Sequence, residues 1–360
     1  MYEDKPVSFD PKELLSVSPE GQLCAAKFSP CGKFLLAGGF DGLVHRWQVE
    51  GEKPEEWASL KGLGGWVSAQ ACDSKGKWMF AGDSWGQLMC WAYDEAEPEP
   101  RWKKADAHNG WILSAAVSPD STLLATSSLD RRVCLWSTED GKPHRTLEGH
   151  KHTVFAVAFH PSGQWLVSGD LFGVIKQWDA NTGECVRELD AKKLYAEHRL
   201  QDVGGVRCFS FDAEGKTLAV GGTQPSNGGN VQGIPTVLLF DWESGKEQRL
   251  LAMGSTGNVY VHDLHLHTSG VVLAVTSGNP GNGQILFQRP AEDKPLYLST
   301  KLSNCHSLSL HPDGQRLAVL ATNKGSNGNG RRVDKDGKYA NNTSPVHFFS
   351  LPESLTNPSA

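Results

Sequence analysis

One stretch of the chain, Gly149 to Asp179, places the strongest constraint on the fold. It holds three short apolar runs, Val154–Phe159, Trp165–Ser168 and Val174–Trp178, which are separated by two turns rich in Gly. Alternating apolar residues between Gly and Pro breaks are typical of antiparallel strands. Three strands cannot bury both faces of a sheet by themselves, so this unit predicts related units packed beside it.

The unit recurs along nearly the whole chain. Its first turn, His160-Pro161-Ser162-Gly163, has counterparts such as Ser29-Pro30-Cys31-Gly32 and His311-Pro312-Asp313-Gly314. Each copy ends on an aromatic residue, and these anchors stand at positions 47, 91, 136, 178, 240, 287 and 348. The first four copies are similar in sequence, whereas the last three share only turns and periodicity. The pattern therefore predicts seven repeated β units in one domain.

This pattern resembles the WD40 family, through the Gly149-His150 pair, the Pro-x-Gly turn and the Trp178-Asp179 ending. The resemblance implies an all-β, seven-bladed propeller with four strands in each blade. Residues 14–17 are expected to supply the outer strand of the last blade, which closes the ring and removes a sheet edge. The expected blades are 22–61, 66–105, 111–148, 153–190, 205–252, 260–300 and 304–351 with 14–17. Residues 1–13 form an arm and 352–360 a tail, on either side of a propeller over 14–351.

Composition restricts the classes of partner. The 360 residues carry a formal net charge of −6 and a pI of about 6.1, which argues against binding to nucleic acid or to an anionic membrane. The eight cysteines show no CxxC pair or metal-like spacing, as expected for free thiols in a reducing compartment. The N-terminus resembles no secretion leader, and no apolar run approaches the roughly 18 residues of a membrane helix. We therefore expect a cytoplasmic protein.

The resemblance also implies a structural hydrogen-bonded tetrad within a blade. In the third unit its four members are His108, Thr126, Asp130 and Trp136. A buried and fully satisfied network of this kind stiffens a blade. The fourth unit has the matching histidine, serine and tryptophan, but Phe172 stands where the aspartate is expected, so its tetrad is predicted to be broken.

Three segments depart from the repeat. The composition of Asp190–Gly204, between the fourth and fifth units, permits about two helical turns. Two long insertions rich in Gly and Asn, over 223–235 and 323–344, are predicted as loops. Such loops open on the top face of a propeller, and loops carry function more often than frameworks do.

The channel mouth on that top face is the expected site of function. Alignment with the family places aromatic residues on one half of the mouth and cationic or titratable residues on the other. Aromatic side chains and arginine are the usual anchors of a binding surface. The predicted partner-binding residues are Trp66, Trp85, Trp111, Phe155, Arg207, Tyr260, His262 and His306.

Two functions remain open for this mouth. The first is a non-catalytic scaffold that binds a protein or peptide with an acidic group, as a subunit of a larger complex, because arginine suits carboxylates and phosphates. The alternative is a small-molecule or hydrolytic, lactonase-like propeller that uses Arg207, His262, Asp263 and His306. Asp263, His265 and His267 alternate along one strand, but its ends are roughly 13 Å apart, too far for one ion. We expect no metal, no cofactor and no catalysis.

Overall fold

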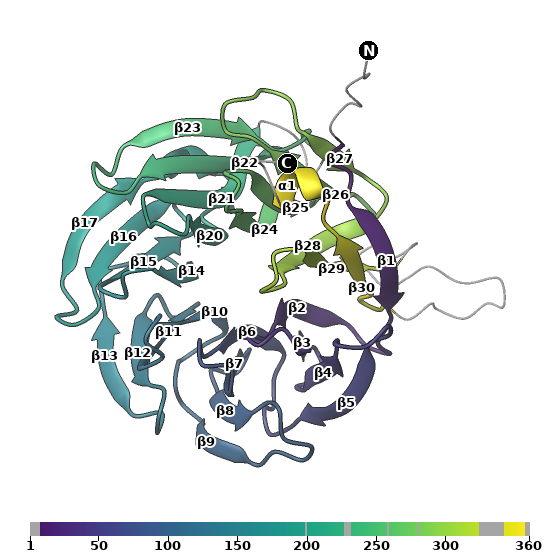
Figure 1. Ribbon diagram of the computed structural model, residues 1–360. Coiled ribbons are helices and arrows are strands. Elements are labelled where there is room, and N and C mark those ends of the chain that lie inside the picture. The colour runs from purple at the N-terminus through teal and green to yellow at the C-terminus, as the bar shows by residue number, and fades with distance from the viewer. Residues whose placement is uncertain are drawn as a thin grey trace.

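The computed structural model describes residues 8–198, 200–226, 232–257, 259–278, 281–323 and 342–356. In this part of the chain, seven four-stranded antiparallel sheets surround a central channel, as the ring in Figure 1 shows. The fold is thus an all-β, seven-bladed propeller. One further two-stranded sheet lies outside the repeat.

The first four blades follow the sequence without interruption, from the innermost strand to the outermost. Their strands are β2 (Leu23–Phe28), β3 (Phe34–Gly39), β4 (Val44–Gln48), β5 (Glu55–Leu60), β6 (Val67–Cys72), β7 (Trp78–Asp83), β8 (Leu88–Ala92), β9 (Pro100–Lys104), β10 (Ile112–Val117), β11 (Leu123–Ser128), β12 (Val133–Ser137), β13 (Pro143–Leu147), β14 (Val154–Phe159), β15 (Trp165–Asp170), β16 (Val174–Asp179) and β17 (Cys185–Asp190).

Blades 5 and 6 keep this order, and blade 7 is completed from the other end of the chain. Their strands are β20 (Cys208–Phe211), β21 (Thr217–Ser226), β22 (Gln232–Asp241), β23 (Glu247–Ala252), β24 (Tyr260–Leu266), β25 (Val272–Ser277), β26 (Gly283–Gln288), β27 (Tyr297–Ser299), β28 (Ser303–Leu310), β29 (Arg316–Thr322) and β30 (Val346–Ser350), with β1 (Lys12–Val17) outermost in blade 7.

The ring is closed by β1, which pairs antiparallel with β30 from Lys12 opposite Ser350 to Val17 opposite Val346. The strand begins two residues before the expected 14–17. Leu15 and Val17 pack on the apolar cluster between blades 7 and 1. The prediction of closure by an N-terminal strand is confirmed.

The core lies between neighbouring blades. The third-strand aromatic anchor of every blade is buried, namely Trp47, Trp91, Trp136, Trp178, Phe240, Phe287 and Phe348. Trp178 of blade 4, for example, joins a cluster with Leu135 and Leu147 of blade 3. The tight turn between the first and second strands of blade 4 favours glycine at position 163, since Gly163 has φ +75° and donates its N–H to the His160 carbonyl at 2.8 Å.

Two predictions about the insertions are wrong. The segment after β17 forms a short 3-10 turn, Lys192–Leu194, and a hairpin of β18 (Tyr195–His198) and β19 (Gln201–Gly204), instead of two helical turns. Much of 223–235 continues β21 and β22 as a long hairpin that pairs as far as Ser226 and Gln232. Of the 323–344 insertion, 324–341 lie outside the described residues.

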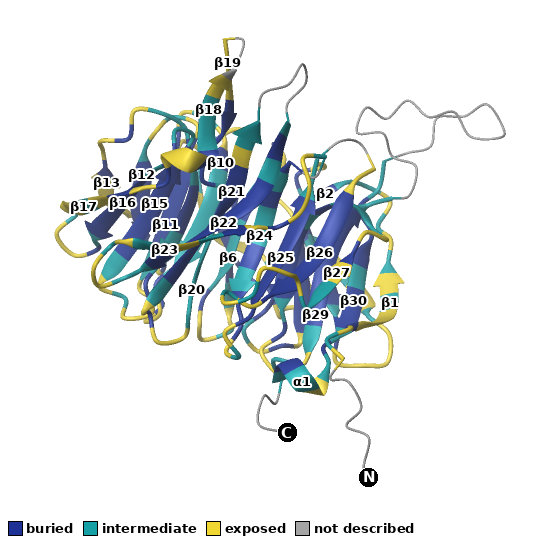
Figure 2. Ribbon diagram, turned by 90° about the horizontal axis from the view of Figure 1, so that it is seen from above, coloured by how far each residue is buried: buried dark blue, intermediate teal, exposed yellow. Residues whose placement is uncertain are grey.

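The two hairpins project from the same face of the ring, while the short helix α1 (Glu353–Thr356) lies on the opposite face (Figure 2). We call the face with the hairpins the top face. Within the described residues, no helix is long and apolar enough to cross a membrane.

Candidate functional site

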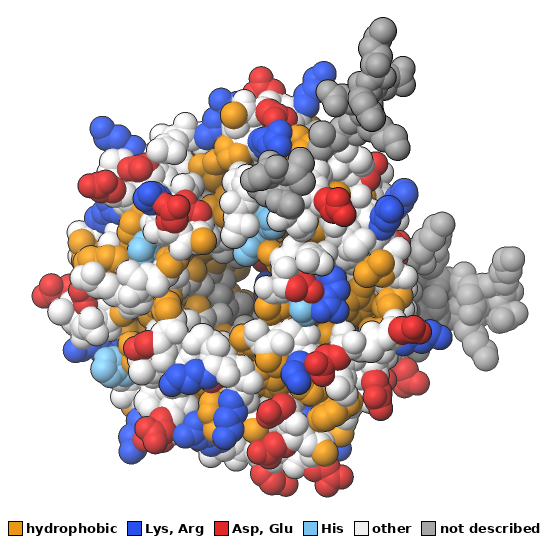
Figure 3. All heavy atoms as spheres, viewed as in Figure 1, with side chains coloured by type: hydrophobic (Ala, Val, Ile, Leu, Met, Phe, Trp, Pro, Cys, Tyr) orange, Lys and Arg blue, Asp and Glu red, His pale blue; other side chains and the backbone are white. Residues whose placement is uncertain are grey.

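The central channel is lined by the innermost strands of the blades and encloses about 320 Å³. Viewed from the α1 face, it is the hollow at the centre of the ring (Figure 3). A register shift interrupts the first strand of several blades, for example between Val154 and Ala156 in β14. Bulges of this kind redirect a side chain. The residues skipped by these shifts line the channel: Cys24, Ser68, Leu113, Phe155 and His262.

Arg207 is held at this level by two aromatic rings. Its guanidinium carbon lies 3.9 Å from the ring centre of Phe155 and 4.8 Å from that of Tyr260. The Nε atom is buried without a hydrogen-bond partner, and no carboxylate among the described residues forms an ion pair with the side chain. Burial lowers the pKa of the guanidinium, against a smaller opposite effect of Tyr260. The arrangement leaves a positive charge that an incoming anion can neutralise.

A second cavity, of about 410 Å³, opens above this arginine. Trp111, Leu129, Phe155, Arg207 and His262 are among its lining residues. The structure thus brings together four of the predicted partner-binding residues, from blades 3 to 6. Leu129 was not among the predicted residues; it is 43% exposed in the turn after β11.

Blades 1 to 3 add an exposed aromatic ledge, which we define as Phe40, Trp66 and Trp111. Phe40 stacks on Trp66 with ring centres 4.6 Å apart, and Trp66 meets Trp111 edge to face at 5.2 Å. Each of these rings remains more than one third exposed. Trp85 is 66% exposed and lies beside the ledge, with its ring packed over Gly64. The contact is close, because a Cβ at Gly64 would lie 2.5 Å from the Trp85 ring. Exposed aromatic patches of this kind mark interaction surfaces.

Both histidines of the mouth are harder to protonate than a free imidazole. Burial lowers the pKa of His262 to about 3, and the charges of His306 and Arg207 act in the same direction. Burial also lowers the pKa of His306, whose two ring nitrogens lie 2.8 Å from the Asn304 carbonyl and 3.2 Å from the Leu23 carbonyl. The His262 ring is therefore neutral near pH 7, and Arg207 supplies the permanent positive charge of this half.

The structural tetrad of blade 3 has the expected members. His108 lies with Nδ1 3.0 Å from Asp130 Oδ2 and with Nε2 2.8 Å from Thr126 Oγ1. The indole N–H of Trp136 donates to the same hydroxyl at 2.8 Å. All four side chains are thereby linked.

The prediction of a broken tetrad in blade 4 is wrong. The missing carboxylate is supplied by Asp170, two residues before Phe172, whose Oδ2 lies 2.9 Å from His150 Nδ1. Ser168 contacts His150 Nε2 at 2.7 Å and accepts the Trp178 indole N–H at 2.7 Å. Because the carboxylate sits at the strand end, the turn position is free for an aromatic residue.

Asp263 is engaged in holding blades together. It accepts hydrogen bonds from Lys27 Nζ of blade 1 at 2.7 Å and from the Leu308 backbone N–H of blade 7 at 3.0 Å. His267, in turn, pairs with the Ser269 hydroxyl at 2.8 Å. Across the described ranges, no group of three His, Cys, Asp or Glu side chains is placed to hold a metal ion.

Comparison with known proteins agrees with the repeat architecture. The WD domain, G-beta repeat pattern of the WD40 family matches residues 12–48, 102–137 and 141–179. Telomerase protein component 1 of Rattus norvegicus and of Mus musculus are both 26% identical, over 330 and 321 residues. Each match covers 88% of this chain but only 11% of the relative. Small ribosomal subunit protein RACK1 of Dictyostelium discoideum is 37% identical over 87 residues, 22% of this chain and 26% of that protein.

Proposed function

The chain belongs to the WD40-repeat family, whose propellers are typically scaffolds for protein interactions, and from this premise we propose a non-catalytic scaffold that binds a protein or peptide at its top face. The binding surface is the aromatic ledge together with the cavity around Arg207. The ledge supplies apolar contact, and Arg207 anchors an acidic group of the partner.

The observation that carries this proposal is the uncompensated charge of Arg207 at the end of an exposed aromatic surface. Two ring contacts hold the guanidinium in place, but they leave its Nε–H without a hydrogen-bond acceptor. A carboxylate or phosphate that enters the cavity can form charge-assisted hydrogen bonds with this guanidinium, which the two rings already hold in place. Because burial lowers the pKa of His262 beside it, Arg207 carries the charge that attracts the anion.

The hydrolytic alternative receives less support. Of the residues that it would use, Asp263 is committed to Lys27 and Leu308, and the ring nitrogens of His306 face backbone carbonyls. A general base must instead be free to reach the proton that it removes. The telomerase and ribosomal relatives are named as components of assemblies, so we propose that this chain also acts as a subunit of a complex.

Affinity purification from the native cell, with quantitative mass spectrometry, tests this function. The test variant is Trp111→Ala/Arg207→Met, since methionine keeps the packing between the rings and removes the charge. Leu298→Ala is a matched control on the outer strand of blade 6, where Leu298 is 49% exposed. We expect the double variant to lose captured partners at least about tenfold, and the control to keep them. Full capture by a correctly folded double variant would overturn the proposal.

A further inference from the structure

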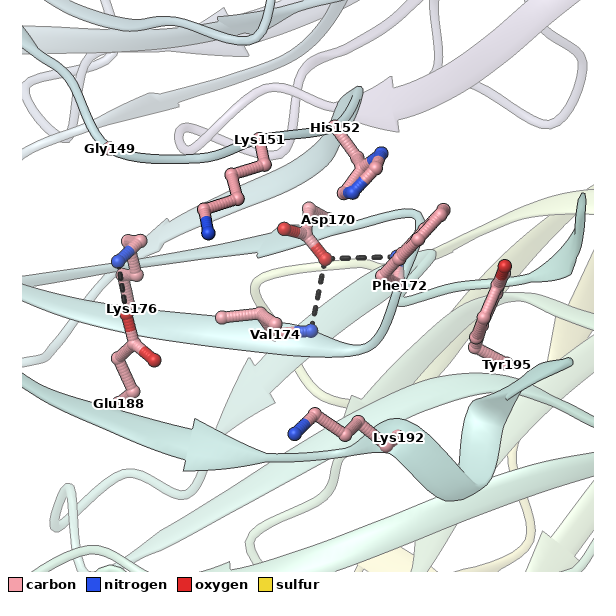
Figure 4. Close-up of a pocket in the computed structure, with 10 residues that line it drawn as sticks. All are labelled: Gly149, Lys151, His152, Asp170, Phe172, Val174, Lys176, Glu188, Lys192 and Tyr195. Carbon is pink, nitrogen blue, oxygen red and sulfur yellow. Dashed lines mark hydrogen bonds and ion pairs between the residues drawn. The ribbon is translucent and has the colours of Figure 1, made fainter.

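A separate cavity of about 500 Å³ lies on the rim of blade 4 and shares no lining residue with the channel or its mouth (Figure 4). Its walls come from the loop before β14, the turn between β15 and β16, the strands β16 and β17, and the inserted segment as far as the start of β18. The volume is within the range of small-molecule sites. Since the insertion is not part of the repeat, the repeat pattern alone does not build this cavity.

The insertion is fastened to the blade beneath it. The Ala191 N–H donates to the Gly173 carbonyl at 2.9 Å, and the Gly205 N–H donates to the Leu194 carbonyl at 2.8 Å. Gly173 has φ +75°, and a Cβ there would lie 2.4 Å from the Ala191 oxygen. This close approach fixes Lys192 and Tyr195, which the insertion contributes to the cavity.

Two lysines of the cavity have no ion-pair partner in the part of the chain that the structure describes. Glu188 forms an ion pair with Lys176. The carboxylate of Asp170 is hydrogen-bonded to His150 and accepts hydrogen bonds from the backbone N–H groups of Phe172 and Val174, both at 3.0 Å. Glu188 is thus compensated by a lysine, and the Asp170 oxygens are occupied by hydrogen bonds within the protein. Lys151 and Lys192 extend into the space from opposite walls (Figure 4), and neither forms an ion pair with any described residue. Two ammonium groups around one space match a doubly charged anion.

One wall of the cavity is aromatic. His152 stacks on Phe172 with ring centres 3.3 Å apart, and Phe172 stacks on Tyr195 at 4.2 Å. The Tyr195 hydroxyl donates to Asp202 at 2.7 Å, which fixes the outer ring of the stack. Val174 extends this apolar wall. A planar apolar group can therefore pack here while an attached anion reaches the two lysines.

We propose that the rim cavity of blade 4 binds a phosphate monoester carried on an aromatic or heteroaromatic group. A phosphate monoester has a charge of about −1.5 to −2 at pH 7, which matches the charge of two ammonium groups. A single carboxylate, with one negative charge, matches them less well. Free nucleotide-like molecules and the phosphotyrosine side chain of a protein share this chemistry. The cavity and its lysines distinguish the site from the top-face surface, so the two proposals can fail separately.

Isothermal titration calorimetry with phenyl phosphate tests the site directly. We expect saturable binding that is weakened about tenfold or more in Lys151→Gln/Lys192→Gln, because both neutralising charges are lost. The matched control, Lys142→Gln/Lys216→Gln, removes two exposed lysines elsewhere and is expected to bind like the wild type. Trp111→Ala/Arg207→Met is also expected to bind normally. No saturation by about 10 mM phenyl phosphate, or equal affinity in the two lysine variants, would overturn the proposal.

Two further comparisons test the role of the aromatic wall and distinguish the possible sources of the ligand. Phenol and inorganic phosphate are each expected to bind more weakly than phenyl phosphate, and equal binding of inorganic phosphate would contradict the aromatic part of the site. The second comparison measures the affinities of adenosine monophosphate and of a phosphotyrosine peptide. Tighter binding of the nucleotide indicates a metabolite ligand, and tighter binding of the peptide indicates a phosphorylated partner. Binding of neither would overturn the proposal as stated.

Discussion

The tetrad of blade 4 makes Ser168 a position where a single oxygen atom has a large effect on stability. Its hydroxyl is fully buried, accepts the Trp178 indole N–H and contacts Nε2 of His150. Ser168→Ala leaves two buried nitrogen atoms without partners. Each unsatisfied group costs about 1–3 kcal/mol, so we expect the free energy of unfolding to fall by about 2–6 kcal/mol.

Equilibrium unfolding in urea, followed by tryptophan fluorescence and circular dichroism, measures this loss. With a slope of about 3 kcal/mol per molar, the midpoint is expected to fall by about 0.7–2 M at an unchanged slope. Ser168→Thr is the matched control, because Thr126 fills the same place in blade 3. It is expected to cost less than about 1 kcal/mol, since the hydroxyl is retained. A Ser168→Ala variant within about 0.5 kcal/mol of the wild type would refute this reasoning.

The other predictions concern pH and the fastening of the insertion. Burial lowers the pKa of His108, but hydrogen bonds and charges, chiefly of Asp130, outweigh it and raise the pKa from 6.5 to about 9. The raised value stabilises the folded state by about 3 kcal/mol below pH 6.5, and this contribution is lost as pH rises through about 9. Unfolding titrations should show this decline in the wild type and a flatter profile in His108→Gln; equal slopes would contradict it. Gly173→Ala should cost at least about 2 kcal/mol, because its side chain meets the Ala191 carbonyl at positive φ. Limited proteolysis should then cut 191–204 faster, and unchanged cleavage would argue against the fastening.

The features that depend on repetition could be predicted from the sequence. The seven aromatic anchors follow from the spacing of apolar residues and turns, and the closing strand was expected from the resemblance to a closed propeller family. Resemblance to a repeat family also aligned the first strands, and that alignment identified Phe155, Arg207 and His262 as residues facing the channel. The sequence position alone did not reveal that a register shift turns the side chains of Phe155 and His262 inward.

Features that depend on tertiary contacts could not be predicted in the same way. The segment after β17 contains good helix formers, but pairing of Tyr195 with Gly204 and packing of Leu194 against blade 5 favour a hairpin. The carboxylate of Asp170 replaces one expected two residues later, a substitution visible only when the strand end is placed beside His150. The neutral state of His262 likewise results from burial, which no local pattern encodes.

The pairing of β1 with β30 has a kinetic consequence. Residues 12 and 350 must meet before blade 7 is complete, so the last blade assembles from segments at opposite ends of the propeller sequence. Contacts between such distant segments form slowly, because closing a long loop costs conformational entropy before the contacts that offset this cost have formed. Until then, β30 has one unpaired edge that can add a strand from another molecule. During synthesis on the ribosome, the first six blades can fold in order before β30 has been made. The strand β1 is made first and stays unpaired until β30 follows.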